Sequence, residues 1–303
     1  MENLWTMFVS SLAGYFRYLG HQITHPGWDN FFYWIIGVSL VVWVLEIIVP
    51  WRKGQAPLRK DFWLDAWWMM FNFFLFTALG YGAVSDVVTY ALRSGVTAIT
   101  GITNFAWIDV SQLPTWAQFA IMFVVVDFIK WNVHRWLHAS PRLWEFHKLH
   151  HSVEQMGFAA HMRYHWMENV VYNAVLYVPL AFFGFGATDF FALHIFTTLI
   201  GHLNHANINV PMGPLKYILN SPQMHIWHHA HDLPAGKNGV NYGITLSVWD
   251  WLFGEAYIPS DGRDIVLGFK GVEQYPHSFI AQNIEPFAAI VHHKRGESPR
   301  ASS

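Results

Sequence analysis

Long apolar stretches, separated by short polar segments, dominate the first two thirds of the chain. A stretch of about 20 apolar residues is long enough to cross a bilayer as a helix. The stretches that approach this length are residues 31–49, 62–82, 114–128 with a helical continuation to 137, 169–185 and 187–200. Residues 4–20 are less apolar and include Arg17, which predicts an interfacial helix, and residues 83–92 predict a short one. The pattern therefore predicts an all-α, polytopic membrane helical bundle.

Composition supports the membrane assignment and narrows the chemistry. Of the 303 residues, 53% are hydrophobic and 13% are charged, whereas soluble domains average about 25% charged residues. The net charge of −2 gives no indication of nucleic-acid binding. The absence of cysteine excludes disulfide scaffolds, thiolate metal sites and thiol nucleophiles. The 19 histidines outnumber the 18 Lys and Arg residues, which indicates metal coordination or proton chemistry.

Loop charge predicts an orientation in the membrane. Residues 51–61 carry four basic residues and residues 130–168 carry five, whereas residues 83–113 carry only Arg93. The positive-inside rule therefore places the two basic segments and the C-terminal region in the cytoplasm, with the N-terminus outside. The expected location is a bacterial inner membrane or the endoplasmic reticulum, with the active site facing the cytoplasm.

Histidines gather in clusters on this predicted cytoplasmic side. His134 and His138 are four residues apart at the end of the third stretch, so both imidazoles point to one side of a helix. Two triplets with the spacing His-x-x-His-His follow, at 147–151 and 225–229. A looser cluster contains the pairs His161/His165 and His202/His205. A single tetrahedral zinc takes at most four protein ligands, so these histidines predict a site for two metals in a histidine-rich cap.

The segments around these histidines resemble those of the fatty acid hydroxylase and sterol desaturase superfamily. Residues 127–138, 143–152 and 221–229 are similar to its three histidine boxes, and Asn241-Tyr-Gly243 and Trp249-Asp-Trp-Leu-Phe-Gly254 resemble its downstream signature. Residues 163–168 resemble its His-Pro-x-Glu segment, with Trp166 in place of the proline. His205, six residues before Pro211, resembles a lone histidine of the family. The resemblance covers residues 115–255.

The resemblance implies a di-iron oxidoreductase that activates dioxygen and attacks a C–H bond of a fatty acyl chain, sterol or related lipid. Hydroxylation or desaturation is expected, and cleavage of an alkylglycerol ether at the same site is the alternative within the superfamily. Two iron ions are expected, although zinc competes well for imidazole in recombinant protein. The expected metal ligands are His134, His138, His147, His150, His151, His205, His225, His228 and His229. His165 and His202 are expected as additional ligands.

Carboxylates and partners complete the expected site. Asp127, Glu145 and Asp250 are expected to accept hydrogen bonds from ligand imidazoles and so to orient them. His25-Pro-Gly-Trp28 lacks the final glycine of the haem-binding His-Pro-Gly-Gly motif. Electrons are therefore expected from a separate cytochrome b-type or ferredoxin-like protein, and the expected substrate is a membrane lipid. The expected domains are an N-terminal membrane region at 1–114, a catalytic domain at 115–258 and a C-terminal tail at 259–303.

Two readings from other functional classes remain open. A zinc-dependent membrane hydrolase would carry a general-base glutamate inside a motif such as His-Glu-x-x-His, and no such motif occurs in the chain. A non-catalytic metal carrier or channel would place ionisable residues through the middle of several spans. Here these residues collect near the cytoplasmic ends, as an enzyme acting on lipids requires.

Overall fold

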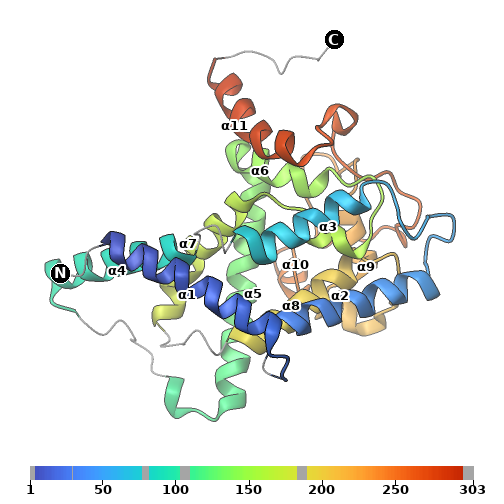
Figure 1. Cartoon of the computed structure of the whole chain (residues 1–303). Helices are drawn as coiled ribbons and strands as arrows, with labels where there is room; N and C mark the ends of the chain where they lie inside the picture. Colours follow the sequence, from blue (N-terminus) through green and yellow to red (C-terminus); the bar gives the residue numbers. More distant parts are fainter. Residues whose placement is uncertain (1–3, 29, 77–81, 103–109, 183–189, 296–303) are drawn as a thin grey trace.

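The computed structural model describes residues 4–28, 30–76, 82–102, 110–182 and 190–295 of the chain (Figure 1). Helices supply the regular structure of these residues. Their β pairing is limited to isolated bridges between Pro50 and Ile208, Leu219 and Leu246, and Ala230 and Leu267. The predicted all-α class is therefore confirmed for the described part of the chain.

The longer elements in chain order are α1 (Leu4–Thr24), α2 (Phe31–Ile48), α3 (Phe62–Met70), α4 (Gly82–Thr100), α5 (Thr115–Ala139), α6 (Pro141–His151), α7 (Trp166–Phe182), α8 (Phe190–His205), α9 (Pro222–His228), α10 (Val248–Leu252) and α11 (Phe279–Arg295). The short elements are the π-helical turn η1 (Phe71–Leu75) and the 3-10 turns η3 (Val110–Gln112), η4 (Phe158–Met162), η6 (Gly213–Tyr217) and η7 (Val272–Gln274).

Two helices of the described chain, α2 and α5, are long and apolar enough to cross a membrane. α2 begins where the Asn30 side chain accepts a hydrogen bond from the Tyr33 N–H, 3.3 Å away, and it stops before Pro50. α5 begins after Pro114, a residue that suits a helix start because it has no N–H to satisfy. Most residues of both helices lie outside the buried interior, which indicates membrane association.

The other predicted spans correspond to shorter helices. The stretch 62–82 is α3 followed by η1, and its residues 77–81 lie outside the described residues. The predicted hairpin is α7 and α8, whose connection at 183–189 also lies outside them. α4 continues to Thr100, well beyond the predicted short helix at 83–92. That α3, α7 and α8 cross the membrane therefore stays a prediction.

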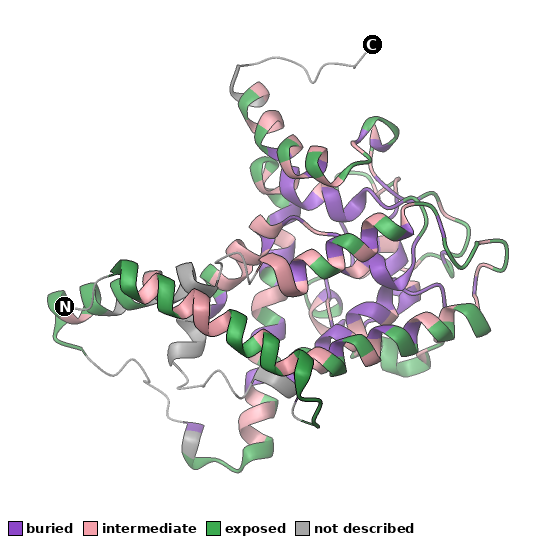
Figure 2. Cartoon of the chain, in the orientation of Figure 1, coloured by how far each residue is buried: buried purple, intermediate pink, exposed green. Residues whose placement is uncertain are grey.

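The helices form a compact body and a projecting arm (Figure 1). α1 packs along α4 in the arm, whereas in the body α2 packs on α8, α5 on α6 and α7, and α9 on α8. Buried residues concentrate in the body, where α5, α6, α8 and α9 meet, and α1 has none (Figure 2).

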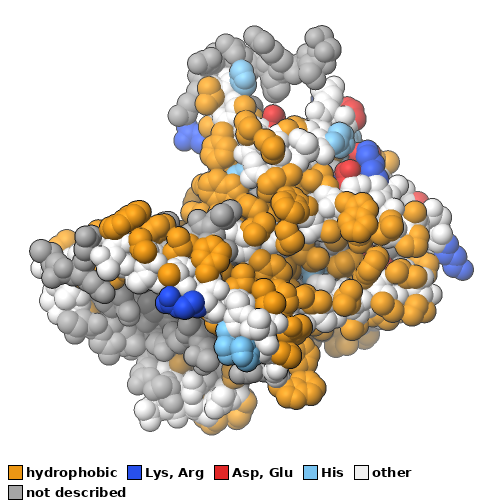
Figure 3. All heavy atoms as spheres, viewed as in Figure 1, with side chains coloured by type: hydrophobic (Ala, Val, Ile, Leu, Met, Phe, Trp, Pro, Cys, Tyr) orange, Lys and Arg blue, Asp and Glu red, His pale blue; other side chains and the backbone are white. Residues whose placement is uncertain are grey.

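Apolar side chains also cover much of the face of the body seen in Figure 3. Ile48 of α2 is 68% exposed and Trp63 of α3 is 73% exposed. Large apolar surfaces of this kind mark contact with another apolar phase. The body therefore has a buried polar centre and an apolar outer face, the arrangement expected beside lipid.

Candidate metal centre

Nine buried histidines converge in the body, and their ring nitrogens form two groups. Within each group, one nitrogen from each ring lies within 4.8 Å of the corresponding nitrogens of the other rings. The first group holds His134 and His138 of α5, His147 and His151 of α6, and His228 of α9. The second holds His150 of α6, His205 of α8, His225 of α9, and His229 just after α9. These are the nine histidines expected as ligands, and the structure brings all of them together.

Each triplet divides between the two groups. On a helix with about 100° per residue, the first and last histidines of His-x-x-His-His lie about 40° apart, and the middle one lies about 100° from the last. In α6, His147 and His151 accordingly face the first group and His150 faces the second. In α9 the pattern is reversed, because His228 faces the first group and His225 and His229 face the second. The same His-x-x-His-His spacing in α6 and α9 thus supplies ligands to two adjacent metal positions.

A short segment after α9 fixes the rings of the first group. The carbonyl oxygens of Asn238, Val240 and Tyr242 lie 3.2, 2.7 and 2.8 Å from Nδ1 of His138, His228 and His134, respectively. Because a carbonyl can only accept, each Nδ1 carries a proton and each Nε2 presents a lone pair. The segment therefore selects the tautomer of three histidines.

Other acceptors fix three further rings in the same way. Nδ1 of His147 donates to Oε2 of Glu168 at 2.7 Å, and Nδ1 of His150 donates to the Arg163 carbonyl at 3.2 Å. Nδ1 of His205 donates to the Gly201 carbonyl, one turn earlier in α8, at 2.8 Å. Six of the nine histidines are thus held with Nε2 free to coordinate.

The free Nε2 atoms face one another. His134 and His147 bring theirs to 3.1 Å, and His150 and His205 do the same. Since all four rings carry their proton on Nδ1, these close contacts set lone pair against lone pair. The buried Nε2 atoms of His138, His151 and His228 have no hydrogen-bond partner within the described chain. One cation in each group would satisfy these atoms.

The nitrogen separations fit metal coordination. Metal–imidazole bonds of about 2.0–2.1 Å place two ligand nitrogens about 2.9 Å apart at a right angle and about 3.4 Å apart at the tetrahedral angle. In the second group the Nε2 atoms of His225 and His205 are 3.0 Å apart, and those of His229 and His225 are 3.2 Å apart. These values and the 3.1 Å contacts fall in that range.

Burial keeps these imidazoles neutral. It is the main cause that lowers the pKa of His150 to about 3, and it lowers the pKa values of His147, His151, His225, His228 and His229 well below the ordinary range. Neighbouring histidines lower most of them further. Neutral imidazole is the form that binds a metal, so at neutral pH the site is prepared to coordinate without first losing protons.

The two additional histidines lie outside both groups. His165 accepts a hydrogen bond from the Met167 N–H through Nδ1 and contacts the Asn283 carbonyl through Nε2, both at 3.2 Å. His202 contacts Ser39 Oγ at 3.0 Å and His161 Nδ1 at 3.2 Å. Both nitrogens of each ring are therefore engaged with protein atoms.

The three expected carboxylates differ in their contacts. Asp250 accepts hydrogen bonds from the N–H groups of Tyr242 and Gly243 at 2.9 and 2.8 Å and from Trp131 Nε1 at 2.8 Å. It therefore supports His134 through the Tyr242 backbone. Burial raises the pKa of Asp250 to about 6.

The other two carboxylates contact other parts of the chain. Asp127 accepts from Trp249 Nε1 in α10 at 2.9 Å and from the Thr245 N–H at 3.2 Å, so its hydrogen bonds hold α10 and the chain before it. Glu145 pairs with Lys148 within α6.

Sequence reasoning missed two parts of the site. Glu168 was placed in a histidine segment but was not expected to contact a ligand, and its signal was an acidic residue at the start of an apolar stretch. The side chains at 238–242 do not indicate the second part, because the contacts with the histidine rings are made by backbone carbonyl oxygens. Gly239 was the available hint, since a Cβ there would lie 2.8 Å from His138 Nδ1.

Comparison of the sequence with known proteins identifies a matching family model and several relatives. Residues 119–255 match the family model "Fatty acid hydroxylase". The chain is 27% identical over 291 residues to ornithine lipid hydroxylase OlsE of Rhizobium tropici, which covers 94% of this chain and 83% of that protein. It is 29% identical to the alkylglycerol monooxygenases of Xenopus tropicalis and Homo sapiens, covering 84% and 76% of this chain but only 51% and 48% of those proteins. No solved structure gives a significant match.

Proposed function

Because residues 119–255 match the fatty acid hydroxylase family model, we propose that this protein is a membrane-associated, O2-dependent oxidoreductase that hydroxylates a lipid at a pair of iron ions. One observation carries the proposal. In each of two adjacent groups of buried histidines, unprotonated Nε2 atoms face one another. Nine neutral nitrogen ligands without a thiolate suit a first-row metal such as iron, and zinc is the competitor.

The iron pair, when bound, supplies the activation of dioxygen. The nine imidazoles would hold the metal, and Glu168 and backbone carbonyls fix the tautomers of six of them. Burial of these groups also excludes water from the reacting centre, which suppresses side reactions. The overall reaction consumes one O2, two electrons and two protons for each C–H bond converted to C–OH, and releases one water.

Two electrons must therefore come from outside the chain. We propose a separate one-electron carrier, cytochrome b-type or ferredoxin-like, that reaches the site from the cytoplasm. The basic residues of the loop after α2 and of the segment after α5 support this orientation by the positive-inside rule.

Ether cleavage is the second candidate, favoured by the similarity to alkylglycerol monooxygenases. Hydroxylation of the carbon beside an ether oxygen gives a hemiacetal, which separates into an aldehyde and an alcohol. The same site and the same oxygen chemistry would serve both outcomes, so the position of the C–H bond relative to an ether oxygen decides between them.

One experiment tests the proposal. Full-length protein is expressed with iron supplementation, and its metal content is measured together with O2 consumption in the presence of total lipid extract and a reduced electron carrier. We expect about two irons per chain and a lipid product heavier by one oxygen, labelled from 18O2. Unlabelled product, or full turnover after removal of the metal, would exclude the proposed chemistry.

A further inference from the structure

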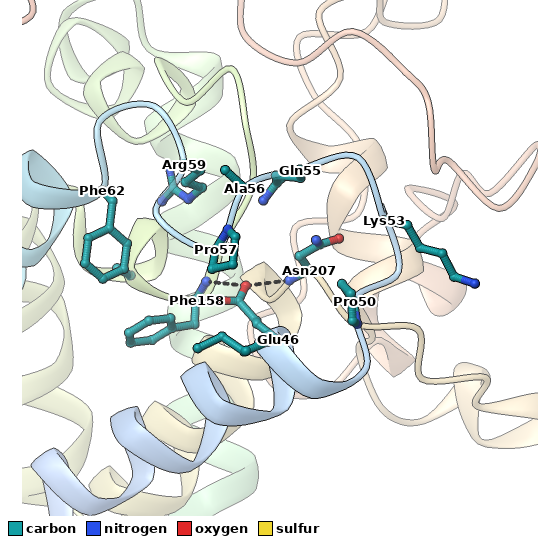
Figure 4. A pocket seen from close by; sticks show the side chains of 12 residues that line it. Glu46, Pro50, Lys53, Gln55, Ala56, Pro57, Arg59, Phe62, Phe158 and Asn207 are labelled. Atoms are coloured by element: carbon teal, nitrogen blue, oxygen red, sulfur yellow. Dashed lines mark hydrogen bonds between the residues drawn. The ribbon is translucent and has the colours of Figure 1, made fainter.

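A small cavity lies at the C-terminal end of α2, between that helix, the following loop, the start of η4 and the segment that follows α8 (Figure 4). Its volume is about 140 Å³, and its polar lining includes Glu46, Lys53, Gln55, Arg59 and Asn207. Since a water molecule occupies about 30 Å³ of liquid, the cavity has room for a small polar group and not for an acyl chain.

Glu46 is the acidic residue of this cavity. Its Oε1 accepts hydrogen bonds from the backbone N–H groups of Phe158 and Asn207, at 2.9 and 2.6 Å (Figure 4). In the described part of the chain Glu46 forms no ion pair with Lys or Arg. A carboxylate in a membrane-spanning segment is costly unless it has a positive partner, and such a residue marks a functional site by default.

The basic residues nearby direct their hydrogen bonds to groups other than Glu46. The Arg52 guanidinium donates to Gln55 Oε1 at 3.2 Å and to the Met156 carbonyl at 3.1 Å. The Arg59 guanidinium is committed to the Asp65 carboxylate and to the Lys60 carbonyl. Lys53 extends outward at the rim (Figure 4). The cavity therefore offers a negative charge inside and a positive charge at its edge, which is the complement of a zwitterion with its cationic end inserted.

The approach to the cavity is apolar. Ile47 and Ile48 of α2 are 45% and 68% exposed, and Leu58 in the loop is 51% exposed. Exposed aliphatic side chains next to lysines are typical of the region where a protein meets the bilayer surface. An acyl chain lying against these side chains would bring its head group to the cavity.

We propose that this cavity binds the ammonium group of a zwitterionic membrane phospholipid, with Glu46 as its counter-ion and Lys53 beside the phosphate. This lipid site goes beyond the proposed hydroxylation, because none of its residues belongs to the histidine groups. It adjoins the metal centre through the backbone, since Asn207 follows His205 by two residues. A head group bound here holds a lipid beside the second histidine group.

Glu46→Gln tests the proposal with little structural change. The amide oxygen still accepts from both N–H groups and the volume is conserved, but the charge is lost. Metal-loaded, full-length protein in non-ionic detergent is titrated with phosphatidylethanolamine, and bound lipid is counted by native mass spectrometry. We expect the variant to bind it about tenfold more weakly, as expected for loss of a hydrogen bond to a charged group. Glu154→Gln is the matched control, because Glu154 pairs with Lys60 on the exposed surface.

Three outcomes would overturn the proposal. Equal binding by wild type and Glu46→Gln would remove the counter-ion role. Equal binding of phosphatidylglycerol, which has no ammonium, would mean surface adsorption. Equal affinity for glycerophosphoethanolamine, which has no acyl chains, would make the ligand a soluble amine. O2-dependent activity is measured on the same samples, so selective lipid binding without activity would contradict only the proposed function, and activity without selective binding would contradict only this site.

Discussion

Which ring nitrogen carries the proton determines which nitrogen of each histidine is free to bind a metal. His228 shows this clearly, because its Nδ1–H is committed to the Val240 carbonyl and its buried Nε2 has no partner in the described protein. Leaving a buried polar atom unpaired costs about 1–3 kcal/mol. A metal removes this cost for His228 and its neighbours together, so the tautomers and the metal depend on each other.

We expect His228→Ala to abolish activity and to lower the metal content, because it removes a ligand from the first group. His231→Ala is the control: its ring lies only three residues further, 31% exposed at the side chain, and it contacts Asp232 at 2.9 Å. Metal analysis and turnover are measured on membrane-extracted protein. Equal losses in the two variants would show that the assay reports folding rather than coordination.

Glu168 differs from the other tautomer-fixing acceptors because it is a side-chain carboxyl group and not a backbone carbonyl. Glu168→Gln keeps an oxygen acceptor for His147 Nδ1 but replaces the carboxyl group by an amide. Loss of such a partner typically lowers metal affinity or activity by about 10–100-fold. We expect a loss of this size in a competition titration with a metal chelator. An unchanged affinity would mean that Glu168 only fills space at the start of α7.

At the scale of elements, the segment from 238 to 243 positions the metal ligands together with the helices. Gly243 lets it pass close to α10, because a Cβ there would lie 2.5 Å from the Leu246 carbonyl oxygen and 2.8 Å from Asp250 Oδ2. Asp250 in turn holds the Tyr242 N–H, and Tyr242 holds His134. The segment thus transmits the position of α10 to a metal ligand.

We therefore expect Gly243→Ala to destabilise the protein by about 1–3 kcal/mol, as overpacking does, and to loosen the metal site. Gly54→Ala is the control, because a Cβ at Gly54 meets no atom within 4 Å. Thermal unfolding and metal content distinguish the two variants. A Gly243→Ala protein with normal stability and weakened metal binding would still support the role of the segment, whereas normal values for both would contradict it.

The helical elements of the site were predictable from the sequence, and their pairing was not. The spacings at 134–138, 147–151 and 225–229 are typical of one side of a helix, and these histidines lie on α5, α6 and α9, except His229 directly after α9. Such spacing can be read from the sequence because 3.6-residue periodicity is a local property. The division of each triplet between two groups depends on how α6 and α9 face each other, which is a tertiary property. Similarly, the sequence does not indicate the hydrogen-bond partners of Asp127, because they lie about 120 residues away in the chain.

For the whole molecule, the buried imidazoles predict a loss of stability in acid. Burial lowers their pKa values in the folded state, that of His150 to about 3, whereas in the unfolded chain histidine titrates near pH 6.5. As the pH falls below about 6.5 the unfolded chain takes up protons first, so the free energy of unfolding decreases. We expect a lower melting temperature at pH 5.5 than at pH 7.5 for metal-free protein, with an unchanged value contradicting the burial of neutral rings.

Removing the metal should also decrease the free energy of unfolding. A ligand present at about 1,000 times its dissociation constant stabilises the folded state by about 4 kcal/mol. Chelation at pH 7.5 should therefore lower the melting temperature by several degrees, and adding back iron should restore it. A melting temperature that does not respond to chelation would mean that the histidine groups are stable without a metal.

The carbonyls at 238, 240 and 242 also have a consequence for biosynthesis. They are translated after the last of the nine histidines, so the nascent chain holds a complete set of coordinating rings before the atoms that orient three of them exist. Rings that still rotate freely select poorly among divalent ions, and affinity alone favours zinc or copper over iron. The choice of metal is therefore most vulnerable while the protein is being made, and a cell that needs the iron form has to control which ions are free near the ribosome at that time.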